Sequence, residues 1–441
     1  MSTTPVRDAV RRSFHRRPAL QRLTLGLLDA VYRVALWPFR RPPRGGAGGE
    51  RADLPARTDE YNTAAERYFA EQQDRAYLLG KPFSDPDNAA RHLIDAGVLM
   101  RALRLRPGDV VAEIGAGTCW LSHMLNRYGC RTIAIDVSTT ALALGRELFE
   151  GDPLTDWTLD PAFLVYDGYT IPLPAAACDR IVLNDAFHHI PNPRALLAEM
   201  FRILRENGVV GMSEPGPGHA AAAHSEAEAA RGVLETDVIA EDVDALARAC
   251  GFRATHVVAA GPSALYQVPA GELGAFMGGR GFAGYWKQFC SSLDRHQYIV
   301  VYKGNPTPTT ARPSVLSARF DIVAPRGSGG LRVARGASAS VILRVTNLGD
   351  TVWLSREGPG WTRVGAHLSG SAETGGADDF DWHRVPLASD VRPGGTERVT
   401  LTLPPLTRSG SYDVTVDLVV EGRTWFATHG SATLVMRMQV V

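Results

Sequence analysis

Between residues 109 and 302, short runs rich in β-branched side chains alternate with stretches whose apolar residues recur every three to four positions. The first pattern predicts buried strands and the second predicts amphipathic helices. The predicted strands are 109–114, 131–135, 162–166, 180–184, 209–213, 254–258 and 298–302, and the predicted helices are 119–128, 140–150, 193–204 and 240–249. This order predicts an α/β fold, with a doubly wound, mostly parallel seven-stranded sheet covered on both faces.

The segment between the last two predicted strands departs from this alternation. It is about forty residues long, and such a length is unusual for a plain connection. It is rich in glycine and holds the aromatic residues Tyr266, Phe276, Phe282, Tyr285, Trp286 and Phe289. We expect an insertion that either covers a substrate or adds a packing layer.

The last part of the chain has a two-residue period and no helical period. Strand-like runs fall at 320–323, 340–346, 351–354, 363–368, 398–403, 412–420, 423–427 and 433–440. Turn-forming sequences such as Asn347-Leu-Gly and Pro393-Gly-Gly separate them. The pattern predicts an all-β sandwich of about 125 residues that resembles Ig-like modules. In this segment Trp353 and Trp425 lie in strand patterns and should be core, whereas Trp361 and Trp382 lie in predicted loops.

These patterns divide the chain of 441 residues into four parts. We predict a basic amphipathic segment and linker at 1–50, the α/β domain at 51–304, a Pro/Thr linker at 305–314 and the sandwich at 315–441. Proline bars regular structure in the second linker.

The N-terminal part is rich in arginine, and residues 19–39 form one broad apolar face. A helix of this kind fits peripheral contact with an anionic membrane surface, or packing against the protein itself or a second subunit. The chain has no apolar run of 18 residues, so a conventional transmembrane helix is not expected. The sequence does not indicate an oligomeric state.

Composition narrows the class of protein further. Hydrophobic residues make up 45% and charged residues 21%, which is typical of a globular protein, and the net charge of zero gives no case for a nucleic-acid partner. The five cysteines have no disulfide-framework or metal-binding spacing. We therefore expect a cytoplasmic protein. Membrane contact through residues 19–39 would place it at the inner face of the membrane. The excess of arginine over lysine is typical of a GC-rich, bacterial genome.

A glycine-rich turn follows the first predicted strand in the sequence Glu113-Ile-Gly115-Ala-Gly117-Thr. Glycine lets a backbone approach a ligand closely, and the following helix start offers free amides. Dinucleotide-binding folds use the same device, but their fingerprint needs a third glycine where this chain has Trp120.

Three further signals follow in order at the carboxyl ends of later strands. Asp136 ends the second strand, where an acid can accept ribose hydroxyls. Asp167 and Gly168 follow the third strand, and Asn184 ends the fourth. Open α/β sheets bind ligands at this edge, so the four signals together predict one nucleotide-type site.

With these motifs, residues 61–303 resemble the class I S-adenosylmethionine (SAM) dependent methyltransferases of the type 11 group. The resemblance implies SAM as cofactor and a site for it. It implies that Glu113, Gly115 and Gly117 form the first cofactor loop, that Asp136 binds the ribose, that Asp167 and Gly168 border the adenine, and that Asn184 lies beside the methionine portion. The chain departs from the family pattern at Cys119, where a third glycine is frequent.

Methyl transfer to a hydroxyl needs an aligned acceptor and a base. The candidate bases are His189, His188 and His219, with His224 further along the same loop. No metal-ligand spacing is found, so no metal is predicted. The preferred acceptor is a sugar hydroxyl of a glycolipid or polysaccharide precursor, with Trp361 and Trp382 as sugar-stacking rings. The alternatives are a small lipophilic acceptor such as a quinone precursor, or a scaffold that binds SAM without turnover.

Overall fold

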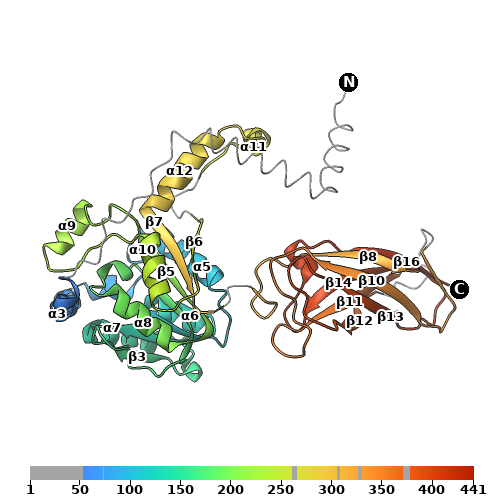
Figure 1. Cartoon of the computed structure of the whole chain (residues 1–441), viewed down its shortest axis with the longest axis horizontal. Helices are drawn as coiled ribbons and strands as arrows, with labels where there is room; N and C mark the ends of the chain where they lie inside the picture. Colours follow the sequence, from blue (N-terminus) through green and yellow to red (C-terminus); the bar gives the residue numbers. More distant parts are fainter. Residues whose placement is uncertain (1–52, 73, 261–265, 305–307, 326–329, 371–377) are drawn as a thin grey trace.

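The computed structural model describes residues 53–72, 74–260, 266–304, 308–325, 330–370 and 378–441. Figure 1 shows an α/β part coloured blue to yellow and an all-β part coloured orange to red, joined by one short connection. The predicted amphipathic segment at 19–39 lies outside the described residues. Within the described ranges, no helix is long and apolar enough to cross a membrane.

The α/β part is built on a seven-stranded sheet in the order β3-β2-β1-β4-β5-β7-β6. Its strands are β1 (Val110–Ile114), β2 (Arg131–Asp136), β3 (Ala162–Val165), β4 (Cys178–Asn184), β5 (Leu204–Pro215), β6 (Ala254–Val258) and β7 (His296–Tyr302). Neighbouring strands from β3 to β5 pair in parallel, whereas β7 is antiparallel to both β5 and β6. The predicted doubly wound, mostly parallel sheet is therefore confirmed.

Helices cover both faces of this sheet. Those that pack on the strands include α5 (Ala89–Ala102), α6 (Trp120–Arg127), α7 (Thr139–Gly151), α8 (Pro193–Ile203) and α10 (Ala240–Ala249), while α3 (Thr58–Glu71) and α4 (Arg75–Leu79) pack on α7 and α9 (Ala223–Ala229) follows β5. Alternate residues of β1 face opposite ways: Val111 packs in a core with α5 and α6, and Ala112 packs in a core with α8 and α10. Successive residues of a strand point to opposite faces of the sheet. Because both faces are buried here, residues at successive positions are apolar, and the strands appear in the sequence as continuous apolar runs.

The strand order reverses between β1 and β4, because β2 and β3 lie on one side of β1 and the later strands lie on the other. At such a switch point the connections leave in opposite directions and open a crevice at the carboxyl ends of the strands. The glycine turn after β1 and Asn184 at the end of β4 both lie at this point.

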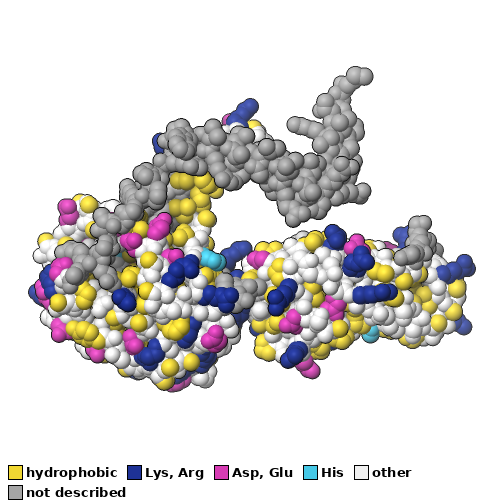
Figure 2. Space-filling model, viewed as in Figure 1, with side chains coloured by type: hydrophobic (Ala, Val, Ile, Leu, Met, Phe, Trp, Pro, Cys, Tyr) yellow, Lys and Arg dark blue, Asp and Glu magenta, His cyan; other side chains and the backbone are white. Residues whose placement is uncertain are grey.

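The aromatic insertion contains two helices that were not predicted, α11 (Leu273–Met277) and α12 (Phe282–Arg295). They project from the sheet as an arm, and Figure 2 shows hydrophobic side chains along it. The rings of Phe282, Tyr285, Trp286 and Phe289 contact one another at i, i+3 and i+4 spacing. Glycines at 274, 278, 279, 281 and 284 masked this period in the sequence.

The C-terminal part is all β, as predicted. Its strands are β8 (Ala318–Ala324), β9 (Leu331–Val333), β10 (Ala339–Asn347), β11 (Thr362–Gly370), β12 (Asp379–Pro386), β13 (Thr396–Leu403), β14 (Gly410–Val420), β15 (Thr424–Trp425) and β16 (Leu434–Val440). One sheet has the order β13-β10-β8 and the other β12-β11-β14-β16-β9. Val341 and Leu343 of the first sheet share a core with Val364 and Val414 of the second, so the two sheets form a sandwich.

Three predictions within the sandwich are wrong in detail. Residues 351–354 form only isolated bridges, because Asn347 and the loop around Val391 take their hydrogen bonds. Trp382 lies in β12 and packs on the core, so it is no loop residue. Trp353 is fully buried as predicted, but Trp425 is half-buried and packs at a tilt against His367 on the outer face of β11.

The connection between the two parts is bonded to both. Thr310 is fully buried against the sandwich, where its hydroxyl donates to the carbonyl of Gly360. The guanidinium of Arg312 donates to both carboxylate oxygens of Asp109 and to the carbonyl of Arg104 in the α/β part. The described part of the predicted linker is thus anchored at both ends.

Candidate active site

A cavity of about 330 Å³ lies at the carboxyl ends of β1, β2, β3 and β4. Its floor is the glycine turn after β1, and α3 lies across it. Most of the predicted site residues line it directly. They are Glu113, Gly115, Gly117, Asp136, Gly168, Asn184 and, among the candidate bases, His189.

The glycine turn is shaped for close approach. Gly115 and Gly117 have φ of +70° and +52°, in the region that L side chains rarely adopt. A Cβ on Gly115 would lie 2.5 Å from the Cβ of Ala186, whereas a Cβ on Gly117 would find its nearest neighbour, a ring atom of Phe69, at 3.5 Å. The first glycine is therefore required by packing, and the second keeps cavity space open.

Glu113 is buried beneath this turn. Its Oε2 accepts hydrogen bonds from the backbone N–H of Ser122 at 2.7 Å and from the hydroxyl of Ser122 at 2.5 Å. Burial raises the pKa of Glu113 to about 8. The carboxyl group thus fixes the start of α6 against β1.

Asp136 bridges two backbone segments at the end of β2. Its Oδ2 accepts from the N–H of Gly117 at 2.7 Å, and its Oδ1 accepts from the N–H of Ser138 at 2.9 Å. Burial raises the pKa of Asp136, and these backbone hydrogen bonds lower it. A carboxylate has about four acceptor positions, so with Val137 as a further backbone donor the side chain, which lines the cavity, still has acceptor capacity for a ligand hydroxyl.

Asn184 has a side-chain oxygen that lacks a partner. Its Oδ1 is buried and makes no hydrogen bond within the described residues. A buried acceptor without a donor is costly, and such an atom at a cavity wall is suited to a ligand N–H. Lys81 also lines this cavity, and burial lowers its pKa. Sequence reasoning missed Lys81, which follows α4 in a segment without a recognisable motif.

Asp167 is exposed and differs from its neighbour Gly168. Its Oδ1 accepts the N–H groups of Tyr169 and Thr170, both at 2.7 Å, and its side chain is not among those lining the cavity. Its backbone carbonyl accepts from the side chain of Asn62, which does line the cavity. Its contribution to the site is therefore through the loop backbone, and a direct role in binding stays a prediction.

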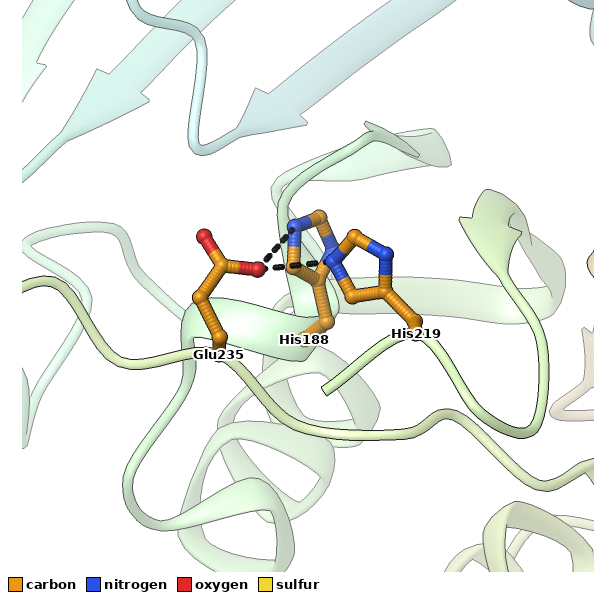
Figure 3. A group of neighbouring side chains, drawn as sticks. All are labelled: His188, His219 and Glu235. Atoms are coloured by element: carbon orange, nitrogen blue, oxygen red, sulfur yellow. Dashed lines mark hydrogen bonds and ion pairs between the residues drawn. The ribbon is translucent and has the colours of Figure 1, made fainter. Parts of the chain in front are cut away.

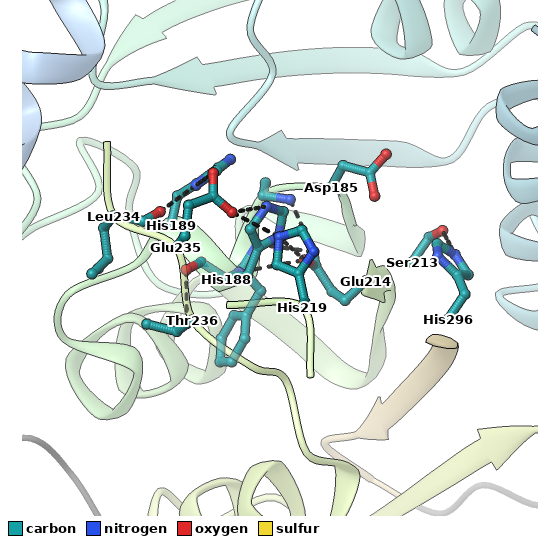
Figure 4. Close-up of polar contacts among 12 residues, drawn as sticks. Asp185, His188, His189, Ser213, Glu214, His219, Leu234, Glu235, Thr236 and His296 are labelled. Carbon is teal, nitrogen blue, oxygen red and sulfur yellow. Dashed lines mark hydrogen bonds and ion pairs between the residues drawn. The ribbon is translucent and has the colours of Figure 1, made fainter. Parts of the chain in front are cut away.

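The three candidate bases differ in their surroundings, as Figure 4 shows. His188 is buried, and its Nδ1 lies 2.8 Å from Oε2 of Glu214. His219 lies 2.7 Å from Oε2 of Glu235 through its Nε2. Neither His188 nor His219 is among the residues that line the cavity.

His189 alone of the three lines the cavity. Its Nδ1 lies 2.6 Å from the carbonyl oxygen of Leu234. A carbonyl can only accept, so Nδ1 carries the proton and Nε2 keeps a free lone pair. Burial, with the nearby charge of His188, lowers the pKa of His189 to about 4. The ring is thus a neutral imidazole with an available acceptor.

Helix α3 was missing from the predicted elements, although it supplies much of the cavity wall. Tyr61, Asn62, Tyr68 and Phe69 all project from it. Glu66 on the same helix accepts from the hydroxyls of Ser138 and Thr140 at 2.6 and 2.5 Å, which holds α3 over the end of β2. The aromatic residues at 61, 68 and 69 were the available signal.

The strands that form this cavity are similar to those of known methyltransferases. Residues 112–212 match a family model described as "Methyltransferase domain". Among curated proteins, the chain is 28% identical over 112 residues to a demethylmenaquinone methyltransferase of Corynebacterium glutamicum, covering 25% of this chain and 44% of that protein. A protein of the same name from Clavibacter sepedonicus is 25% identical over 114 residues, covering 26% and 44%. The chain spans less than half the length of these curated relatives.

Two solved structures are also similar. Geranyl diphosphate C-methyltransferase from Streptomyces coelicolor is 17% identical, with a TM-score of 0.38 over 55% of this chain and 97% of that one. A methyltransferase in complex with its Trm112 activator from Haloferax volcanii is 18% identical, with a TM-score of 0.39 over 53% and 99%. Both TM-scores are below 0.5, so these two similarities carry no functional weight.

Proposed function

We propose that the protein is a class I SAM-dependent methyltransferase, which transfers a methyl group from SAM to an acceptor bound beside His189; the match of residues 112–212 to a methyltransferase family model supports this. The single observation that supports this most strongly is the position of the cavity. It lies at the switch point of the sheet, lined at once by the glycine turn, Asp136 and Asn184.

The chemistry of the lining residues fits SAM. Asp136 has acceptor capacity for the ribose hydroxyls, and the unpaired Oδ1 of Asn184 suits the amino group of the methionine portion. Lys81 places an ammonium group in the same cavity, where it suits the carboxylate of that portion. When bound, SAM supplies an electrophilic methyl group on a sulfonium, which is a good leaving group.

The protein's own contribution is alignment and proton removal. Alignment of acceptor, methyl group and sulfur is the larger part, since the displacement is in line. His189 Nε2 is the acceptor atom that can take a proton from a hydroxyl, because Nδ1 is engaged by the carbonyl of Leu234. His188 and His219 are positioning residues in this proposal, because Glu214 and Glu235 hold them behind the cavity wall.

We propose a small lipophilic acceptor with an acidic hydroxyl, such as a phenol or a quinol. The cavity that His189 and Glu235 line supports this choice, because several of its other side chains are apolar or aromatic. These are Tyr68, Phe69, Ile190, Pro191, Val233 and Leu234. Two curated relatives are named demethylmenaquinone methyltransferases, which is the same chemical class.

A sugar hydroxyl stays a second candidate, and one cluster on the sandwich favours it. His367 and Phe380 are stacked at 4.3 Å between ring centroids, Trp425 packs beside them, and Arg384 lies over Trp425. Phe380 is 68% exposed. An exposed ring with a neighbouring guanidinium is a surface on which a sugar can stack, and it replaces the predicted pair Trp361 and Trp382.

The test is methyl transfer from labelled SAM to a panel of naphthoquinols, phenols and alkyl glycosides. We expect turnover with the first two groups, and His189→Ala should lower kcat about 100-fold while SAM affinity stays nearly constant. His224→Ala is the matched control and should leave kcat unchanged, because His224 is an exposed histidine at the start of α9. Turnover with glycosides alone favours the second acceptor. Binding without turnover on any acceptor favours a scaffold and contradicts the proposal.

A further inference from the structure

Behind the cavity wall, two imidazoles and a carboxylate converge from three different loops. Figure 3 shows His188, from the 3-10 turn η4 (Phe187–His189), and His219, from the loop after β5, both directed at Glu235. The Oε2 of Glu235 lies 2.7 Å from Nε2 of His219 and 3.9 Å from Nε2 of His188. One ligand atom from each residue falls within 4.8 Å of the other two.

We propose that these three residues form a binding site for a divalent first-row transition metal of the Zn²⁺ class. Two imidazoles and one carboxylate are a donor set that such ions prefer, and three protein ligands leave one position for water. Bonds of about 2.0–2.2 Å from one ion require ligand atoms about 3–4 Å apart, so shifts of under about 1 Å close the site.

The surroundings of His188 supply an independent observation. Metal-binding histidines usually donate their second ring N–H to a carboxylate, which fixes the tautomer. Here Nδ1 of His188 faces Oε2 of Glu214 at 2.8 Å, which leaves Nε2 directed at Glu235. Glu214 is fully buried and also accepts the backbone N–H groups of Ala186 and Phe187, so its orientation is fixed by β5 and η4 together.

The local charge balance favours a cation. Glu214 and Glu235 place two carboxylates close together. Within the described ranges, the recorded partners of these carboxylates are imidazoles and backbone N–H groups, and none is a guanidinium or an ammonium group. Glu235 is 7% exposed at its side chain and His188 is 6% exposed. Buried carboxylates are normally paired with a cation or coordinate a metal.

A second cluster in the same domain shows the contrast. His92, Asp95 and Asp185 also offer ligand atoms within 4.8 Å of one another. There, however, Nη1 of Arg91 lies 3.1 Å from Asp95 and 2.9 Å from Asp185, so a guanidinium already supplies the positive charge. At Glu235, no guanidinium or ammonium partner is recorded among the described residues, and the groups that face the carboxylate are the imidazoles of His188, His189 and His219.

The position of the site indicates what the ion would do. Glu235 also lines the cavity, and its Oε1 lies 3.6 Å from Nδ1 of His189. An ion held by Glu235, His188 and His219 would join η4, the loop after β5 and the segment at 233–239 into one wall. The metal would thus order the acceptor side of the cavity without touching the glycine turn.

The experiment uses the full chain, stripped of metal with a chelator and titrated with Zn²⁺ by calorimetry and with Co²⁺ by visible absorption. We expect one high-affinity equivalent and Co²⁺ d–d bands of a four- or five-coordinate site. His219→Ala and Glu235→Gln should each weaken Zn²⁺ binding by at least about 100-fold, exceeding the 10–100-fold typical of outer-shell partners. His224→Ala should bind as the unmodified chain does, although its ring lies 5.2 Å from that of His219.

Two further readouts keep the result clear. Zn²⁺ should raise Tm of the unmodified chain but not of either ligand variant, provided that circular dichroism shows both variants folded. Absence of a high-affinity equivalent, or equal binding by His219→Ala and His224→Ala, overturns the proposal. Binding of S-adenosylhomocysteine (SAH), measured separately, tests the methyltransferase proposal alone, because its contacts lie across the cavity at Asp136 and Asn184.

Discussion

Replacing Asp136 by alanine should weaken cofactor binding by a definite amount. The carboxylate holds the N–H groups of Gly117 and Ser138 and still has acceptor capacity for a ribose hydroxyl in the cavity that it lines. A lost hydrogen bond to a charged group is worth roughly 1.5–3 kcal/mol, which corresponds to a roughly 10- to 150-fold rise in Kd. The two backbone N–H groups lose their partner as well, so the free energy of unfolding should fall by about 1–3 kcal/mol.

The assay is calorimetric titration with SAH, alongside urea unfolding of the ligand-free protein. Asp156→Ala is the matched control, because Asp156 also accepts a backbone N–H, that of Thr158 at 2.9 Å, but is exposed and away from the cavity. It should leave Kd unchanged. A folded Asp136→Ala protein that binds SAH within about twofold of the unmodified chain would refute the assignment of the ribose site, because the lost hydrogen bond predicts a larger change.

Three other changes test particular contacts. In urea unfolding, Gly115→Ala should destabilise the protein by about 1–3 kcal/mol more than Gly117→Ala does. Both substitutions place a side chain at a positive φ, but only the one at Gly115 also overlaps Ala186. Equal losses of unfolding free energy would contradict this reading. Burial raises the pKa of Glu113 to about 8 in the folded protein, against 4.5 in the unfolded chain, so between these pH values the folded state binds one proton more than the unfolded state. The free energy of unfolding should therefore fall as pH rises from about 4.5 to 8, by up to roughly 1.4 kcal/mol per pH unit. Glu113→Gln should flatten that slope, and an unchanged slope rules Glu113 out as its source. Arg312→Ala leaves the buried carboxylate of Asp109 without its guanidinium partner, so the free energy of unfolding should fall by about 1–3 kcal/mol. Proteolytic cleavage near residue 305 should also become faster. Identical cleavage rates would show that the ion pair does not anchor the connection.

The strands and the cofactor edge of the sheet were predictable because their signals are local. Each predicted strand of the α/β part is a short apolar run, and the polar residues predicted to bind the cofactor lie in the last two positions of a strand or directly after it. Glu113, Asp136 and Asn184 all lie where parallel strands end, so the sheet topology alone brings them together. The positions of Gly115 and Gly117 followed from the tight turn that connects β1 to α6.

The features that sequence reasoning missed depend on contacts between distant segments. Helix α3 precedes the sheet, and nothing local shows that Tyr68 and Phe69 fold over a cavity formed by residues far along the chain. The prediction of no metal, which stays a prediction, rested on the absence of a short ligand spacing. His188, His219 and Glu235 are 31 and 16 residues apart along the chain and meet only through the loops after β4 and β5. A spacing rule cannot detect such a group.

The positions of the tryptophans show the same limit in the sandwich. Trp353 and Trp425 both sit in strand-like runs, but only Trp353 faces the interior between the sheets. Trp425 belongs to the two-residue strand β15 at the sheet edge, where it covers Gly365 on the outer face. A period of two fixes which residues share a face but leaves open which face is buried when the strand is this short.

The central claim is that the cavity at the carboxyl ends of β1 and β4 binds SAM. Calorimetric titration of the full chain with SAH, and separately with NADH, tests it most directly, because both ligands carry an adenosine and only the rest of the molecule differs. The geometry at Gly117, Asp136 and Asn184 predicts saturable binding of SAH at one site per chain and no measurable heat with NADH. Saturable binding of NADH with no binding of SAH would contradict the claim.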